Sequence, residues 1–172
     1  MRLSPLSPWE REGPSPKGWE DEGLMPVQFE LVTPERLLVS QEVDMVVVPG
    51  TDGDFGVLPG HAPLISTIRP GTVDIYSGNT ITERIFVVGG IAEVTPERCT
   101  VLADEAMSPD SLDRGALDAE LTEIEGNLPS LREQLGRATG PDRDRLAVEL
   151  RTLERQQSVA RAKLQALAET SR

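Results

Sequence analysis

The hydrophobic period of this chain changes once, near Pro109, and that change limits the possible fold more than any other feature. Before it, apolar and polar residues alternate in short runs, as in "VQFEL" at 27–31. After it, apolar residues recur in steps of three and four. A period of two is typical of a strand with one buried face, and steps of three and four are typical of a helix with an apolar stripe. The sequence therefore predicts a β region followed by a helical region.

The β region consists of short apolar runs bounded by glycine and proline. "DMVVVPG", "GTVDIYSG", "TITERIFVVGG", "IAEVTPE" and "RCTVLADEA" repeat the pattern, and "YSGNT" has the composition of a hairpin turn. Many short strands at close spacing are typical of an antiparallel β sandwich or a flattened barrel. We expect this domain to span residues 25–108.

Two leucine-rich seams follow, from Leu117 to Leu135 and from Leu146 to Leu167. Narrow seams of this kind pack one helix on another, and "ATGPD" between them supplies a helix stop and a helix start. The sequence predicts an antiparallel helical hairpin over residues 109–172. Pro129 lies inside the first seam, and because a proline removes a helical hydrogen bond, we expect a kink or break near residues 126–129.

Residues 1–24 show no hydrophobic period and hold four prolines. We interpret them as a disordered extension or as an artefact of the choice of start site, because the ordered pattern begins at Met25. No apolar run approaches the ~18 residues that a membrane-spanning helix needs.

Composition excludes several classes of protein. Hydrophobic residues make up 38% of the chain, which argues against a disordered protein. The net charge is −12, and residues 25–111 hold 13 acidic residues against 4 basic ones. Such a surface repels phosphate backbones, so we expect no nucleic-acid partner. Cys99 has no cysteine to pair with, and its strand-like surroundings predict a buried side chain.

Signatures of catalysis, metal binding and cofactor binding are missing from the sequence. With one histidine and one cysteine, the chain cannot build a histidine-based metal cluster. "GTDGDFG" lacks the lysine of a phosphate loop, and the twelfth position counted from Asp52 is Pro63, where a calcium loop needs glutamate. We therefore expect no catalytic residue, no metal and no cofactor.

The stretch "GDFGVLPGHAPLIS", at 53–66, is the strongest candidate for a contact surface. Its glycines and prolines indicate a rigid, closely packed excursion. Phe55, Val57 and Leu58 fit either an exposed partner site or the ordinary core, and composition leaves both alternatives open. We interpret His61 as a residue that satisfies turn backbone groups or caps a contact surface, rather than as a general base.

Arginines off the leucine seam mark a second candidate surface. Arg151 and Arg155 lie four residues apart, where like charges repel by about 0.2–0.5 kcal/mol. An acidic partner would offset this repulsion, and so would Glu154 together with solvent.

Three stretches together resemble a known family. "GTDGDFGVLPGHAPLISTIRPGTVDI", "VVGGIAEVTPERCTVLADEA" and the trailing hairpin are similar to the epsilon subunit of the F-type ATP synthase, which is called delta in mitochondria. The resemblance covers about residues 26–168. It implies a ten-stranded β sandwich and two C-terminal helices, in a non-catalytic subunit of the central stalk.

The resemblance also implies partners and roles. Such a subunit binds gamma and the membrane ring of c subunits, and it couples proton flow to ATP synthesis at the alpha/beta catalytic heads. The implied location is peripheral, on the cytoplasmic face of the bacterial inner membrane, with the membrane reached only through the complex. The helices of many members also inhibit ATP hydrolysis. By analogy the ring contact comprises Asp54, Phe55 and Gly56, the gamma contact comprises His61, Val57 and Leu58, and the contact with beta comprises Arg151, Arg155 and Arg161.

One motif departs from the family pattern. Some bacterial members bind ATP through [Ile/Leu]-Asp-x-x-Arg-Ala at the start of the first helix. Here Leu112 and Asp113 match, but Ala116 stands in place of the arginine, so we do not predict ATP binding. The alternative function is a stand-alone module that senses a nucleotide or another small ligand.

Overall fold

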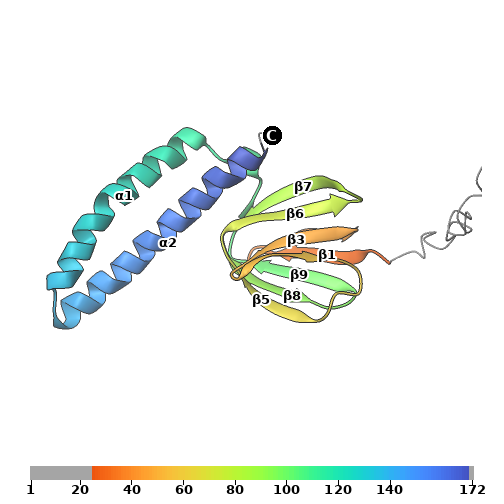
Figure 1. Ribbon diagram of the computed structural model, residues 1–172, viewed down its shortest axis with the longest axis horizontal. Helices are drawn as coiled ribbons and strands as arrows, with labels where there is room; N and C mark the ends of the chain where they lie inside the picture. Colours follow the sequence, from red (N-terminus) through yellow and green to blue (C-terminus); the bar gives the residue numbers. More distant parts are fainter. Residues whose placement is uncertain (1–24, 171–172) are drawn as a thin grey trace, which may run out of the picture.

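The structure is a computed structural model, and it describes residues 25–170 (Figure 1). Ten strands form one sheet that curls around a core. The strands are β1 (Val27–Val32), β2 (Leu37–Val43), β3 (Met45–Gly50), β4 (Gly53–Val57), β5 (Leu64–Ile68), β6 (Gly71–Ser77), β7 (Thr80–Val87), β8 (Gly90–Val94), β9 (Arg98–Ala103) and β10 (Ala106–Met107).

The strand order is β10-β7-β6-β3-β5-β8-β9-β1-β2. Strand β4 is not part of this order and pairs with β3. The β1–β9 pairing is parallel and the other pairings are antiparallel. The predicted ten-stranded β sandwich is therefore confirmed. "YSGNT" forms the turn between β6 and β7, as predicted.

The core lies between the two halves of the curled sheet. Alternate residues of each strand enter it: in β1, Val27, Phe29 and Leu31 are buried while the residues between them are partly exposed. Cys99 is fully buried in this core, as the sequence predicts. Burial raises the pKa of its thiol to about 12, because the apolar surroundings disfavour the thiolate.

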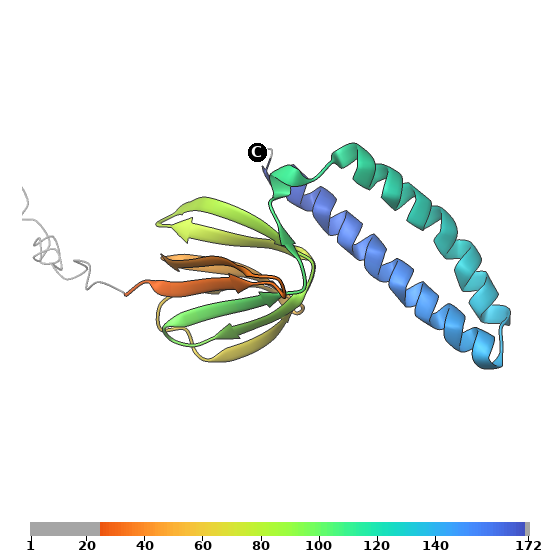
Figure 2. The same cartoon turned by 180° about the vertical axis from the view of Figure 1, so that it is seen from behind.

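The helices follow a short 3₁₀ turn, η1 (Pro109–Ser111). They are α1 (Arg114–Arg137) and α2 (Gly140–Thr170), and they form the predicted antiparallel hairpin (Figure 2). Leu117, Ile124, Leu128 and Leu131 of α1 are buried along the seam. The turn between the helices projects away from the sandwich, whereas the C-terminal end of α2 lies beside it.

Helix α1 is continuous across Pro129, and its course bends along its length (Figures 1 and 2). Of the predicted kink or break, the break is absent, and α1 is a single bent helix. Pro129 is exposed, so the carbonyl that loses its helical donor faces water, which can satisfy it. Leu128 and Leu131 lie on the buried side and hold the helix on α2 across the proline.

Helix α2 carries a second apolar stripe besides the leucine seam. Val159, Ala162 and Ala166 pack against Phe86 of β7 and against Val88, the residue that follows this strand. In β7, Ile85 and Val87 belong to the core of the sandwich. Phe86 and Val88 therefore point to the opposite face of the sheet, where α2 covers them. The hairpin is thus docked on the sandwich by one face of α2.

The prediction for residues 1–24 lies outside the described residues. Within residues 25–170, neither helix is long and apolar enough to cross a membrane.

Candidate interaction surfaces

The β3–β4 hairpin carries the three residues expected at a membrane ring. The backbone N–H of Thr51 in its turn donates to the carbonyl oxygen of Thr67 at 2.9 Å, which ties the hairpin to β5. Asp54 is exposed and forms an ion pair with Arg69. Gly56 is exposed as well, but Phe55 is half-buried and packs against the core. The tip of the β3–β4 hairpin therefore exposes the Asp54 carboxylate and the Gly56 backbone to a partner. The Phe55 ring mainly anchors the hairpin to the core of the sandwich.

The loop at 58–63 is a tight turn held by backbone hydrogen bonds within the loop and to the turn between β8 and β9. Gly60 has a φ of 77°, which suits glycine, and its N–H donates to the carbonyl oxygen of Pro96 at 2.8 Å. The Nδ1 atom of His61 lies 2.7 Å from the carbonyl oxygen of Ala62, so the proton of that bond is on Nδ1. His61 thus stabilises the turn, in agreement with the sequence interpretation.

Two neighbours in this loop have opposite environments. Val57 is fully buried in the core, so its side chain cannot belong to an exposed contact with gamma, and that part of the expectation is corrected. Leu58 is 53% exposed and remains available to a partner. The alternation of β4 explains the difference, because Val57 is its last inward-facing residue.

An apolar patch on the outer face of the sandwich was not predicted. Ile65 of β5 is 74% exposed, and Ile91 of β8 and Leu102 of β9 are each 49% exposed. Ile91 pairs directly with Leu102, and Thr67 opposite Ile91 places Ile65 one diagonal step away. We call Ile65, Ile91 and Leu102 the outer apolar patch. The sequence does carry one signal for this patch: each of the three strands has an apolar residue at a position whose side chain faces outwards.

The arginines expected to meet the beta subunit are mostly engaged within the chain. The Nη2 atom of Arg155 lies 3.3 Å from Oδ2 of Asp104 in the sandwich, and Nη2 of Arg161 lies 2.6 Å from Oε1 of Glu125 in α1. Hydrogen bonds from Arg161 and Gln157 lower the pKa of Glu125. Arg151 is exposed to solvent. In the docked hairpin, Arg155 and Arg161 would have to exchange these partners to reach another protein.

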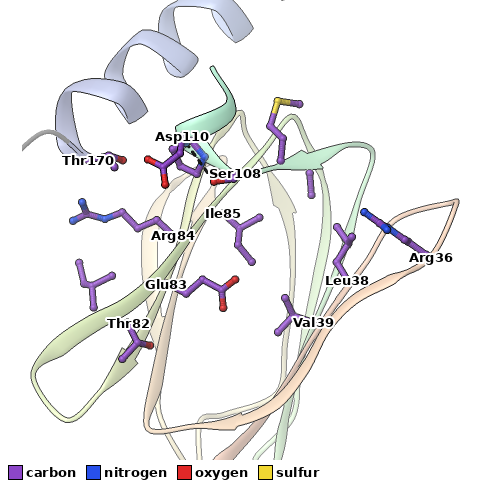
Figure 3. Close-up of a pocket in the computed structure, with 14 residues that line it drawn as sticks. Arg36, Leu38, Val39, Thr82, Glu83, Arg84, Ile85, Ser108, Asp110 and Thr170 are labelled. Carbon is purple, nitrogen blue, oxygen red and sulfur yellow. Dashed lines mark hydrogen bonds between the residues drawn. The ribbon is translucent and has the colours of Figure 1, made fainter. Parts of the chain in front are cut away.

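A groove of about 650 Å³ lies between the two edges of the curled sheet (Figure 3). Strand β2 contributes Leu38 and Val39, and β7 contributes Glu83, Arg84 and Ile85. Its lining holds two arginines, Arg36 and Arg84, and two acidic residues, Glu83 and Asp110, and this balance of charge weakens it as a site for phosphates.

Asp113, which matches the ATP-binding motif of some family members, stabilises the start of α1. The Oδ1 atom of Asp113 accepts a hydrogen bond from the backbone N–H of Ala116 at 2.9 Å, so Asp113 is the N-cap of α1. Among residues 25–170, no three metal-ligating side chains gather in one place.

Comparison with known proteins identifies the family. Residues 26–109 match the family profile described as the ATP synthase delta/epsilon chain, beta-sandwich domain. The ATP synthase epsilon chain of Rhodospirillum centenum is 51% identical over 144 residues, which is 83% of this chain and 92% of the relative. That of Rhodospirillum rubrum is 55% identical over 111 residues, which is 64% of this chain and 83% of the relative.

A solved structure supports the fold. A chain in the cryo-EM structure of the Euglena gracilis mitochondrial ATP synthase, OSCP/F1/c-ring in rotational state 1, superposes with a TM-score of 0.65 at 18% identity. The match covers 96% of this chain and 97% of that one. The β sandwich, the helical hairpin and the identity with curated relatives over most of the chain lead to one conclusion: this chain belongs to the family of ATP synthase epsilon chains, non-catalytic subunits of the central stalk of the rotary ATP synthase.

Proposed function

We propose that this subunit binds gamma through the outer apolar patch and the adjoining 58–63 loop. The main observation in favour of this contact is the patch itself, because three large apolar side chains on neighbouring strands are exposed to water. Contiguous exposed apolar surface rimmed by polar residues marks a site of protein association. Leu58 and His61 come from the loop that leads into β5, the strand that carries Ile65. Patch and loop therefore form one continuous surface.

The β3–β4 hairpin is the proposed contact with the membrane ring. Its exposed carboxylate, Asp54, is positioned by Arg69, and its turn is fixed to β5. A rigid hairpin suits a contact that must transmit rotation, since little of the applied force is lost in bending. Through the ring, the complex would sit at the cytoplasmic face of the bacterial inner membrane and couple proton flow to ATP synthesis.

The helical hairpin of α1 and α2 is proposed to inhibit ATP hydrolysis, as a brake, when it leaves the β sandwich. Its docked form holds Arg155 and Arg161 in ion pairs with Asp104 and Glu125. Undocking frees Arg155 for an acidic surface of the catalytic heads. The docked hairpin is therefore the state in which the brake is off.

Binding to purified gamma tests the main proposal. Ile65→Asp places a charge at the most exposed residue of the patch, and we expect a loss of affinity of at least about thirtyfold, the effect of an interface hot spot. Val148→Asp is the matched control, because Val148 is a similarly exposed apolar residue (53%) on the hairpin. Circular dichroism verifies that both variants fold. Gamma affinity unchanged by Ile65→Asp would remove the patch from the interface.

A further inference from the structure

The last turn of α2 lacks a cation of its own. A helix leaves its final carbonyl oxygens without helical donors, and a positive charge near this end is stabilising. Helix α2 ends at Thr170 and has no basic residue in its last turn. The missing charge comes from the sandwich: Nη1 of Arg84 donates to the carbonyl oxygen of Glu169 at 2.8 Å. Arg84 therefore caps a helix that lies 85 residues further along the chain.

Asp74 lies directly across the sheet from Arg84. The two residues are paired in the β6–β7 ladder, and Oδ1 of Asp74 lies 3.6 Å from Nε of Arg84. This is too long for a hydrogen bond, and both atoms are buried without a hydrogen-bond partner among residues 25–170. The side chains are 18% and 28% exposed. The pair is thus an ion pair under the end of a helix, with its hydrogen bonds incompletely satisfied.

A second carboxylate, that of Glu169, lines the same cavity as this ion pair. Glu169 of α2, Asp54 of β4, and Arg69 line a cavity of about 280 Å³ together with Asp74 and Arg84. Tyr76 is the remaining titratable residue that lines it. Docking of α2 covers Asp74 and brings the Glu169 carboxylate towards it, and both effects oppose ionisation of Asp74.

We propose that Asp74 and Arg84 form an acid-sensitive latch, which holds the end of α2 on the sandwich and binds it more firmly when a proton is taken up. Arg84 supplies the attachment to the Glu169 carbonyl. Asp74 sets the proton dependence, because its negative charge is costly only while α2 covers it. The neighbouring apolar contacts of Phe86 and Val88 with α2 provide docking that does not depend on pH.

The direction of the pH effect follows from the pKa of Asp74. Burial, opposed by Arg84 and reinforced by Glu169, raises this pKa above its ordinary value of 3.8 in the docked state. The protonated form therefore favours docking. This contribution is fully present below pH 3.8 and is lost as the pH rises through the raised pKa of the docked state. Acidification tightens the latch, and a return towards neutral pH loosens it.

Release of the latch has a consequence for the hairpin arginines. The Arg155–Asp104 ion pair also joins α2 to the sandwich, and it can exist only while α2 is docked. Loosening the end of α2 therefore favours the form in which Arg155 is free. The latch itself is a property of the isolated chain and does not depend on the proposed contact with gamma.

Hydrogen exchange of the full chain tests the latch. In Arg84→Met the aliphatic stem is kept and the charge is lost, and we expect amides in the last two turns of α2 to exchange about tenfold faster at neutral pH, the upper part of the range for a charge at a helix end. Arg98→Met is the matched control, because Arg98 pairs with Glu30 on the outer face of β9. Equal protection in both variants would refute the attachment. If Arg84→Met fails to fold, Arg84→Lys, which keeps the charge but not the planar fork, is expected to give a smaller acceleration in the same amides.

The proton dependence is tested separately with Asp74→Asn. After correction for intrinsic exchange rates, opening of the last two turns of α2 in the natural chain should increase as the pH is raised from 3.8 to neutral. Asp74→Asn should remove most of this increase, because asparagine imitates the protonated carboxyl. If Asp74→Asn keeps the same pH dependence of opening, the role of Asp74 is refuted. The attachment by Arg84 is then judged by the Arg84→Met experiment alone.

Discussion

Replacement of Phe86 by alanine should separate the docking of the hairpin from the stability of the sandwich. Phe86 is fully buried, yet it lies on the outer side of β7, against Met107 and the small residues Ala162 and Ala166. Its neighbour Val87 is equally buried but faces the core. The two adjacent residues therefore report on two different contacts of the same strand.

The expected size of the effect follows from the burial. Truncation of a buried phenylalanine to alanine costs about 3–5 kcal/mol, and here the loss falls on the contact with α2. Because about 1.4 kcal/mol corresponds to a factor of ten, a loss of about 3 kcal/mol raises the undocked fraction roughly a hundredfold. Val87→Ala removes two core methyl groups, worth about 2 kcal/mol, from the sandwich and should leave the undocked fraction unchanged.

Thiol labelling measures the undocked fraction directly. Ala166 is 2% exposed beneath Phe86, so a cysteine introduced as Ala166→Cys reacts only when α2 leaves the sandwich. The natural Cys99 contributes little background, since it is fully buried and its pKa is about 12. In the Ala166→Cys chain, labelling should accelerate roughly a hundredfold with Phe86→Ala and stay constant with Val87→Ala. Equal acceleration in both would refute the division of β7 into an inner and an outer role.

Three further predictions concern the rotor contact, the brake and the buried thiol. Asp54→Lys should lower ATP-driven proton pumping by membrane vesicles without lowering gamma binding, whereas Glu35→Lys, in the β1–β2 turn, should leave pumping intact; normal pumping with Asp54→Lys would contradict the ring contact. Arg151→Glu should raise ATP hydrolysis by the assembled enzyme, with Arg143→Glu as the control, and unchanged hydrolysis in both would argue against a brake that uses Arg151. The pKa of Cys99 is raised from 9.0 to about 12, so the thiol stabilises the fold below pH 9 and this contribution is lost as the pH rises towards 12. Denaturant unfolding at about pH 8 and about pH 10.5 should therefore show a smaller loss of stability in Cys99→Ala than in the natural chain, and equal losses would refute this linkage.

Periodicity predicted the elements of this protein well because each depends on local sequence. Alternation in β1 and the leucine steps of the helices directly follow strand and helix geometry. Pro129 was harder, since its local penalty predicted a kink or break, whereas the seam residues Leu128 and Leu131 hold the helix together from the buried side. Tertiary packing outweighed a local preference there.

The contact surfaces were predicted only in part. The stretch at 53–66 was singled out from its composition, but its sequence left Val57 and Leu58 equal, and only the fold buries one and exposes the other. The outer apolar patch escaped notice because its members come from three strands that are separate in sequence. Their proximity exists only through the β5-β8-β9 order of the sheet.

The sequence by itself determined the two structural classes, the point where one gives way to the other, and the family, because hydrophobic period and motif are properties of neighbouring residues. Only the tertiary structure decided how the two parts meet. The stripe of Val159, Ala162 and Ala166 in α2 has no visible purpose until β7 presents Phe86 to it. Arg84 and Glu169 are 85 residues apart, and their contact depends on the docking of the whole hairpin. Long-range contacts of this kind arise from the balance of packing and charge across the folded chain, which no local pattern records.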